Sequence, residues 1–122
     1  MQVREVAERI IAACNIPPIE PTCDQLITGD WNSEVTGIVT TFMATVDVIH
    51  AAIAQGANLI ITHEPTYFTH LDQTDWLQRD PVYQQKQTLI AENGINIWRF
   101  HDHMHRTEPD LIYAGLNQEL GW

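Results

Sequence analysis

The first hydrophobic pattern along the chain has the period of a helix. Apolar residues recur three, four, seven and eight positions apart and would share one helical face: Val3, Val6, Ala7, Ile10, Ile11 and Cys14. The Pro17-Pro18 pair cannot continue a helix. We therefore predict an amphipathic helix from Val3 to about Cys14, followed by a connecting stretch from about Ile19 to Ser33.

The next segments read as strand, helix and strand. Val35–Thr41 is rich in β-branched residues and has the length of a strand. Thr45 is a typical N-cap for a helix that runs through Ile53 and ends at Gly56. Leu59–Thr62 is apolar without alternation, which is typical of a strand covered on both faces. This second strand is therefore predicted to be buried and parallel.

The remaining pattern adds two helices and one strand. Pro81–Glu92 is predicted as a helix because Pro lies in its first turn and Gly94 follows its end. Ile95–Phe100 is the third strand, and the last helix covers about Pro109–Leu120. Strands that alternate with helices predict an α/β fold, with a mostly parallel sheet and helices on both faces. Residues 1–122 form a single domain in this interpretation, either complete or the N-terminal part of a longer protein.

Charge narrows the classes of partner. The chain has 16 acidic and 6 basic side chains, a formal net charge of −10, and would repel nucleic acid and anionic lipid. No apolar run approaches the roughly 20 residues that cross a bilayer. Glu5 and Glu8 are atypical of a targeting peptide. We expect a cytoplasmic protein with no nucleic-acid or membrane partner, in which converging carboxylates and imidazoles attract divalent cations.

Candidate ligands follow two of the predicted strands. The second strand runs into His63-Glu64, and the third runs into a segment with half of the chain's six histidines, namely His101, His103 and His105. In parallel sheets, ligands collect beyond the carboxyl ends of the strands. The two clusters are therefore predicted to meet at one edge of the sheet.

The local geometry of the histidine-rich segment decides which side chains converge. If the strand continues, His101, His103 and His105 share one face. If the segment turns helical, His101 and His105 still meet as an i, i+4 pair. We predict His63, Glu64, His101 and His105 as metal ligands. Imidazole with carboxylate suits zinc, iron or manganese, and the residue types do not rank the three.

Four other side chains receive more specific predictions. Asp102 and His103 are candidate catalytic residues that would move a proton to or from a metal-activated water. Asp102 is also a candidate for orienting an imidazole, and His103 for binding the metal or contacting substrate. His50 lies in a predicted helix and His70 follows an aromatic loop, so we assign neither to the site.

Three segments carry a resemblance to a known family. They are Val35–Val39, the helix Val46–Ala52 and the run Gly56–Pro65, in which Gly-Ala-Asn leads into an apolar strand and then His-Glu-Pro. The stretch from Val35 to His105 resembles the first half of the Nif-three-like dinuclear-metal family, also called GTP cyclohydrolase I type 2. The resemblance implies two divalent ions, a hexameric ring and a nucleotide-like substrate.

The sequence departs from the family pattern at three places. His63-Glu64 stands where the family has a His-His pair, and His105 stands where the family has Asp, four residues after His101. These two exchanges keep the overall charge of the ligands while moving the carboxylate. Thirdly, the family has a C-terminal His-x-x-x-Glu pair that this sequence lacks, because no histidine follows His105.

Two classes of function fit these residues. The leading hypothesis is a metal-dependent hydrolase that uses metal-activated water on an unidentified small molecule. The alternative is a non-catalytic metal-binding protein that serves as an oligomeric scaffold or binds a partner. The metallo-β-lactamase pattern His-x-His-x-Asp-His fits less well, because His105 comes one position early and the required Asp is missing.

Overall fold

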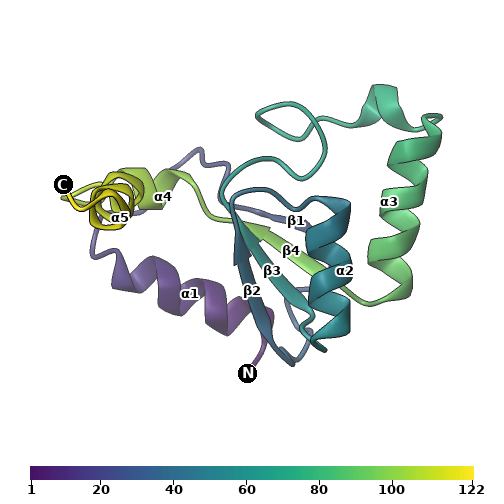
Figure 1. Cartoon of the computed structure of the whole chain (residues 1–122), viewed down its shortest axis with the longest axis horizontal. Coiled ribbons are helices and arrows are strands. Elements are labelled where there is room, and N and C mark those ends of the chain that lie inside the picture. Colours follow the sequence, from purple (N-terminus) through teal and green to yellow (C-terminus); the bar gives the residue numbers. More distant parts are fainter.

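A four-stranded sheet organises the molecule. The computed structural model describes all 122 residues. The strands are β1 (Leu26–Thr28), β2 (Ile38–Thr41), β3 (Leu59–Thr62) and β4 (Asn96–Arg99), in the spatial order β1-β4-β3-β2. β2, β3 and β4 run parallel, and β1 is antiparallel to β4. The sheet is therefore mostly parallel, with one antiparallel edge strand (Figure 1).

Helices cover both faces of this sheet. The long ones are α1 (Val3–Ala13), α2 (Val46–Ala54), α3 (Pro81–Glu92) and α5 (Leu111–Leu120), and the short ones are a 3₁₀ turn (Asp75–Leu77) and α4 (Asp102–His105). α1 lies on one face, and α2 and α3 lie on the other (Figure 1). α4 follows β4 directly and leads into α5. None of the helices has the length and apolar character needed to span a membrane.

The alternation of side chains along β3 and β4 produces two cores. Towards α1, the buried residues are Val3, Val6, Ala7, Leu59, Ile61, Trp98 and Phe100. Towards α2 and α3, they include Ile49, Ala52, Ile60, Ile90 and Ile97. β3 and β4 are buried along their whole length, and their apolar side chains divide between the two cores, with Leu59, Ile61 and Trp98 on one side and Ile60 and Ile97 on the other. The predicted α/β class, with a mostly parallel sheet between helices, is confirmed.

The sequence signals at helix ends have the expected physical roles. The Thr45 hydroxyl accepts a hydrogen bond from the backbone N–H of Val48 at the start of α2. Asp80 caps α3 in the same way, with Pro81 in the first turn. Gly94 follows α3 at φ +61°, a conformation that favours glycine.

Two features of the fold differ from the sequence prediction. The connecting stretch 19–33 contains β1, which was not predicted because three residues are too few to show a period. Its pairing with β4 also has a register shift. After β4 the chain turns helical, so the second of the two geometries considered for the histidine-rich segment is the one observed.

Candidate metal centre

The parallel pairing of β3 with β4 brings two distant histidines to one edge of the sheet. Thr62 pairs with Arg99, so His63 and His101 leave the sheet at the same end. The backbone N–H of His105 then donates to the carbonyl of His101 at 3.1 Å, which closes one helical turn. This turn places the His105 ring on the same side as His101.

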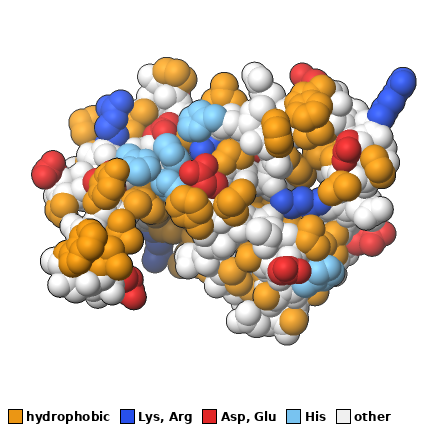
Figure 2. Space-filling view, turned by 45° about the horizontal axis from the view of Figure 1, so that its top comes forward, with side chains coloured by type: hydrophobic (Ala, Val, Ile, Leu, Met, Phe, Trp, Pro, Cys, Tyr) orange, Lys and Arg blue, Asp and Glu red, His pale blue; other side chains and the backbone are white.

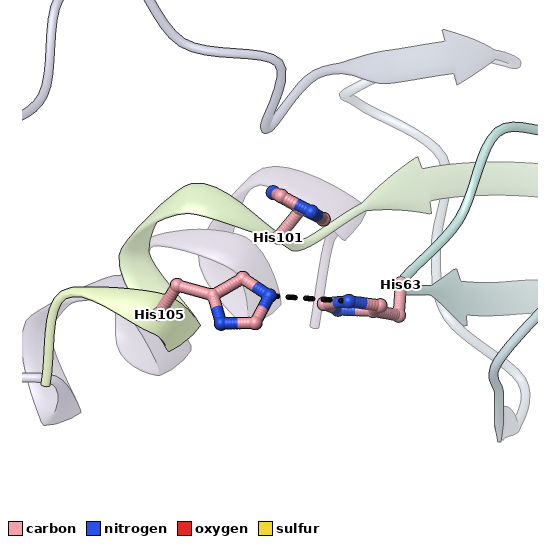
Figure 3. A group of neighbouring side chains, drawn as sticks. All are labelled: His63, His101 and His105. Atoms are coloured by element: carbon pink, nitrogen blue, oxygen red, sulfur yellow. Dashed lines mark hydrogen bonds between the residues drawn. The ribbon is translucent and has the colours of Figure 1, made fainter. Parts of the chain in front are cut away.

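Three imidazoles converge at this edge. His63, His101 and His105 each offer a ring nitrogen within 4.8 Å of the others. The ring centroids of His63 and His101 are 4.5 Å apart, and those of His101 and His105 are 4.7 Å apart. The Nε2 atoms of His63 and His105 approach to 3.3 Å (Figure 3). We call His63, His101 and His105 the three-histidine group.

Carboxylates fix the orientation of two of these rings. The Nδ1 of His101 lies 2.9 Å from Asp102 Oδ1, and the Nδ1 of His105 lies 2.7 Å from Asp110 Oδ2. A carboxylate accepts hydrogen bonds, so each Nδ1 donates to its acidic partner and Nε2 is the ring nitrogen left to bind an ion. This is the arrangement in which protein imidazoles bind metal ions, with the second nitrogen held by an acidic partner.

His63 completes the group with an unsatisfied nitrogen. Its side chain is buried, and its Nδ1 has no hydrogen-bond partner. Burial lowers the pKa of the His63 imidazole, and His101 and His105 lower it further. The ring is therefore held neutral at pH 7, as a metal ligand must be. Three imidazoles with ring nitrogens within 4.8 Å of one another, one of them with a buried nitrogen left unpaired, fit a divalent transition-metal ion.

Asp24 positions the turn that carries His101 and His105. Its fully buried carboxylate accepts hydrogen bonds from the backbone N–H groups of His101, Asp102 and His103, at 2.6, 2.7 and 2.9 Å. It also lies 2.7 Å from His103 Nδ1. The sequence analysis missed Asp24, because it lies 77 residues from His101 in a stretch with no predicted structure.

The predicted catalytic residues lie outside the three-histidine group. The Asp102 carboxylate accepts from Thr22 Oγ1 and Cys23 N, both at 2.9 Å, besides contacting His101. Burial alone would raise the pKa of Asp102, but these hydrogen bonds outweigh it and hold the pKa well below its usual range. His103 is only 4% exposed, pairs with Asp24 and lines a separate cavity of about 330 Å³ under α1.

Cys23 forms a second cluster with His101 and Asp102. One ligand-type atom from each lies within 4.8 Å of the others. Burial, together with a hydrogen bond to Asp102 at 3.3 Å, raises the pKa of the Cys23 thiol to about 11. The thiol therefore stays protonated at neutral pH and acts as a donor. These residues form a hydrogen-bond network behind His101.

Glu64, the fourth predicted ligand, follows His63 but contributes no atom to the three-histidine group. Its backbone N–H donates to the carbonyl of Phe42 at 2.8 Å, and its side chain is half-buried.

A cavity of about 430 Å³ opens beside His63. Its lining is mostly apolar and includes Ile10, Phe42, Ile61, Phe100, Met104 and Ile112.

Comparison with known proteins gives a consistent result. A family model described as Duf34/NIF3 (NGG1p interacting factor 3) matches residues 1–120. The chain is 32% identical over 95 residues to a GTP cyclohydrolase 1 type 2 homolog from Clostridium acetobutylicum, covering 78% of this chain and 32% of that protein. A homolog of the same name from Staphylococcus aureus is 44% identical over 95 residues, covering 78% of this chain and 24% of the other.

Solved structures show the same fold. Staphylococcus aureus hypothetical protein SA1388 matches with a TM-score of 0.77 and 24% identity, over 99% of this chain and 34% of that one. Reduced HcgD from Methanocaldococcus jannaschii matches with a TM-score of 0.75 and 21% identity, over 97% of this chain and 47% of that one. The chain spans about a quarter to a third of the length of these curated relatives. With nearly its whole length matched by the family model, the chain belongs to the Duf34/NIF3 family.

Proposed function

We propose that this chain holds a divalent transition-metal ion between His63, His101 and His105 and acts as a metal-dependent hydrolase on a small molecule. The convergence of three ring nitrogens within 4.8 Å carries the proposal. Two of these rings are oriented by carboxylates, and the third has a buried nitrogen with no partner. A histidine cluster that served only solubility would need none of these features.

The donor set bears on which ion binds and how many. Three neutral imidazoles suit zinc or iron, and a carboxylate ligand would extend the choice to manganese. The three-histidine group supplies the protein ligands for one ion. Glu64, next in the chain to His63, is the group available to a second ion, which the family resemblance implies.

The protein's own residues would prepare the site for chemistry. A divalent ion bound by three protein ligands supplies hydroxide at neutral pH by lowering the pKa of a water molecule. Asp102 and Asp110 hold the rings of His101 and His105 through Nδ1, which leaves the Nε2 of each ring to bind the ion. Proton transfer by Asp102 or His103 stays a prediction, and their hydrogen bonds favour a positioning role for both.

The cavity beside His63 supports a small-molecule substrate. Its volume of about 430 Å³ and apolar lining fit the size and character of ligand pockets in proteins. The curated relatives are named GTP cyclohydrolase 1 type 2 homologs, which makes nucleotides the first compounds to test. A hexameric ring and a cytoplasmic location stay predictions.

A hydrolysis screen of the metal-reconstituted protein tests the enzymatic proposal. Zinc-, iron- and manganese-loaded samples are incubated with nucleoside triphosphates, including GTP, and with simple esters and amides. We expect turnover of at least one class, lost on chelation and in the variant His101→Ala. His50→Ala is the matched control, because His50 is an exposed histidine on α2. Metal-loaded protein without turnover of any class would contradict the hydrolase assignment.

A non-catalytic scaffold is the second candidate, and helix α5 favours it. No residue of α5 is buried, and its large apolar side chains are exposed: Leu111, Tyr113, Leu116 and Leu120. Such a surface is typical of a protein–protein contact. A catalytic site keeps an open coordination position and a structural site closes it. Solvent proton relaxation of the manganese-loaded protein measures exchangeable water at the ion and separates the two functions.

A further inference from the structure

A closed loop places a fourth histidine beside the three-histidine group. The Asp72 carboxylate accepts hydrogen bonds from the backbone N–H groups of Thr66, Tyr67 and Phe68, at 2.6, 2.7 and 3.3 Å. The Lys86 ammonium donates to the Thr66 carbonyl. These contacts fold residues 66–72 into a compact loop that carries His70.

A buried arginine ties this loop to the metal centre. Arg99, at the end of β4, is 1% exposed, and no carboxylate lies within ion-pair distance of it. Its Nε donates to the His63 carbonyl at 3.0 Å, and one terminal nitrogen donates to the His70 carbonyl. A buried cation without a counter-ion is costly, so these contacts matter to the fold.

The same guanidinium determines where the proton lies on His70. The other terminal nitrogen of Arg99 is 3.3 Å from His70 Nδ1. Arginine only donates hydrogen bonds, so Nδ1 must accept and the proton of the neutral ring lies on Nε2. His101, His103 and His105 have the opposite arrangement, because their Nδ1 atoms face carboxylates.

His70 lies next to the three-histidine group, but its hydrogen bonding differs from that of the predicted ligands, because its Nδ1 faces a donor and not a carboxylate. Its ring centroid lies 5.5 Å from that of His101, nearly perpendicular at 77°. Figure 2 shows several histidine side chains gathered on one face of the molecule. The Nε2 of His70, which carries the proton in this arrangement, points away from the Arg99 guanidinium. The positive charge of that guanidinium polarises the ring and strengthens Nε2–H as a donor.

We propose that His70 Nε2–H is the hydrogen-bond donor of an oxyanion-binding position beside the three-histidine group. The substrate class that fits carries an anionic oxygen, as a phosphate or a carboxylate does. A neutral imidazole in this role stabilises negative charge without giving up its proton. The buried charge of Arg99 favours an anion here, in a chain that is otherwise strongly acidic. This assignment rests on the proposed metal-dependent function.

The tautomer can be measured on metal-free protein. Long-range ¹H–¹⁵N correlation spectra of ¹⁵N-histidine protein at pH 7.5 distinguish Nε2–H from Nδ1–H rings, and His70→Gln identifies the His70 signals by their loss. We expect Nε2–H for His70, and Nδ1–H for His101 and His105. An Nδ1–H tautomer at His70 would overturn the proposal. This readout needs no metal, so it is independent of whether the three-histidine group binds an ion.

Anion binding to the zinc-reconstituted protein tests the role itself. Inorganic phosphate and acetate, titrated separately, distinguish the two sources of anionic oxygen. His70→Ala should weaken binding of at least one anion about tenfold, while zinc stoichiometry stays that of wild type. His70→Gln, which keeps an N–H donor, should recover part of the loss, and His50→Ala should bind as wild type does.

The outcomes separate the two proposals. Unchanged binding of both anions in His70→Ala would overturn the oxyanion-binding position even with zinc present. Failure of wild-type protein to take up zinc would overturn the proposed function, and the tautomer of His70 would then still decide the assignment of its proton.

Discussion

His103 and His105 lie two residues apart in the same helical turn, yet their surroundings differ. His103 is buried against Asp24, whose carboxylate is saturated by backbone and side-chain donors. The His105 ring is partly exposed and directs Nε2 towards His63. Both rings have an acidic partner at Nδ1. What differs is the exposure of the ring, together with the approach of His105 Nε2 to His63, and this separates a residue that supports the fold from one available to a ligand.

Removing Asp24 should have the largest effect. Asp24→Ala leaves the N–H groups at the start of α4 and His103 Nδ1 without their acceptor. We expect the free energy of unfolding to fall by about 3–5 kcal/mol, as for other broken buried pairs. Urea unfolding of the metal-free protein measures it. Asp30→Ala is the control, as an aspartate outside this network, and a loss in Asp24→Ala below about 1 kcal/mol would show that α4 holds its own geometry.

A substitution of Asp110 tests whether His105, the more exposed of the two histidines, is a metal ligand. Asp110→Asn weakens the hold on His105 Nδ1 and should reduce metal affinity about 10–100-fold, the usual effect of losing an outer carboxylate. Competition with a chromophoric chelator measures the affinity. Asp110 also caps α5 through Ile112 and Tyr113, so the asparagine is chosen to keep that cap. Wild-type affinity in this variant would mean that His105 is not a ligand.

Protonation of His63 gives a smaller, pH-dependent effect. The pKa of His63 is lowered in the folded state, so the unfolded chain binds more protons once the pH falls below the ordinary value of about 6.5. This contribution to stability is complete above that pH and is lost as the pH falls through the folded pKa. Unfolding of metal-free protein at pH 7.5 and pH 5 should show a greater loss for wild type than for His63→Gln. Equal losses would contradict the depressed pKa.

Glu64 should have the smallest effect on the first ion. Its carboxylate lies outside the three-histidine group. Glu64→Gln should change affinity for that ion by no more than about threefold, the size expected of one half-exposed charge. The chelator competition used for Asp110 serves here too. A loss as large as that of His63→Ala would return Glu64 to the ligand set predicted from the sequence.

Patterns within one segment predicted most of this architecture. Periodicity located α1, the Pro81 and Gly94 signals located α3, and an unbroken apolar run located β3, with β4 predicted as the strand that follows Gly94. Because parallel strands end at one edge, the same patterns predicted that His63 would meet His101 and His105, and the structure brings them together.

What the sequence could not reveal depends on long-range contacts. β1 is held by its pairing with β4, and Asp24 by hydrogen bonds to residues 77 to 79 positions away. The capping role of Asp110 could have been predicted from the sequence, because an aspartate before an apolar helical run is an N-cap signal. His70 looked unremarkable because its partner Arg99 is distant in sequence and lies on a strand.

Metal stoichiometry tests the central claim most directly. Metal-free wild type, His63→Ala, His101→Ala and the control His50→Ala are reconstituted with zinc, iron or manganese, desalted and analysed by inductively coupled plasma mass spectrometry. The three-histidine group predicts at least one tightly bound ion per chain in wild type and His50→Ala, lost in both His63→Ala and His101→Ala. Wild-type protein that retains no ion, or variants that retain as much as wild type, would contradict a metal centre at this edge of the sheet.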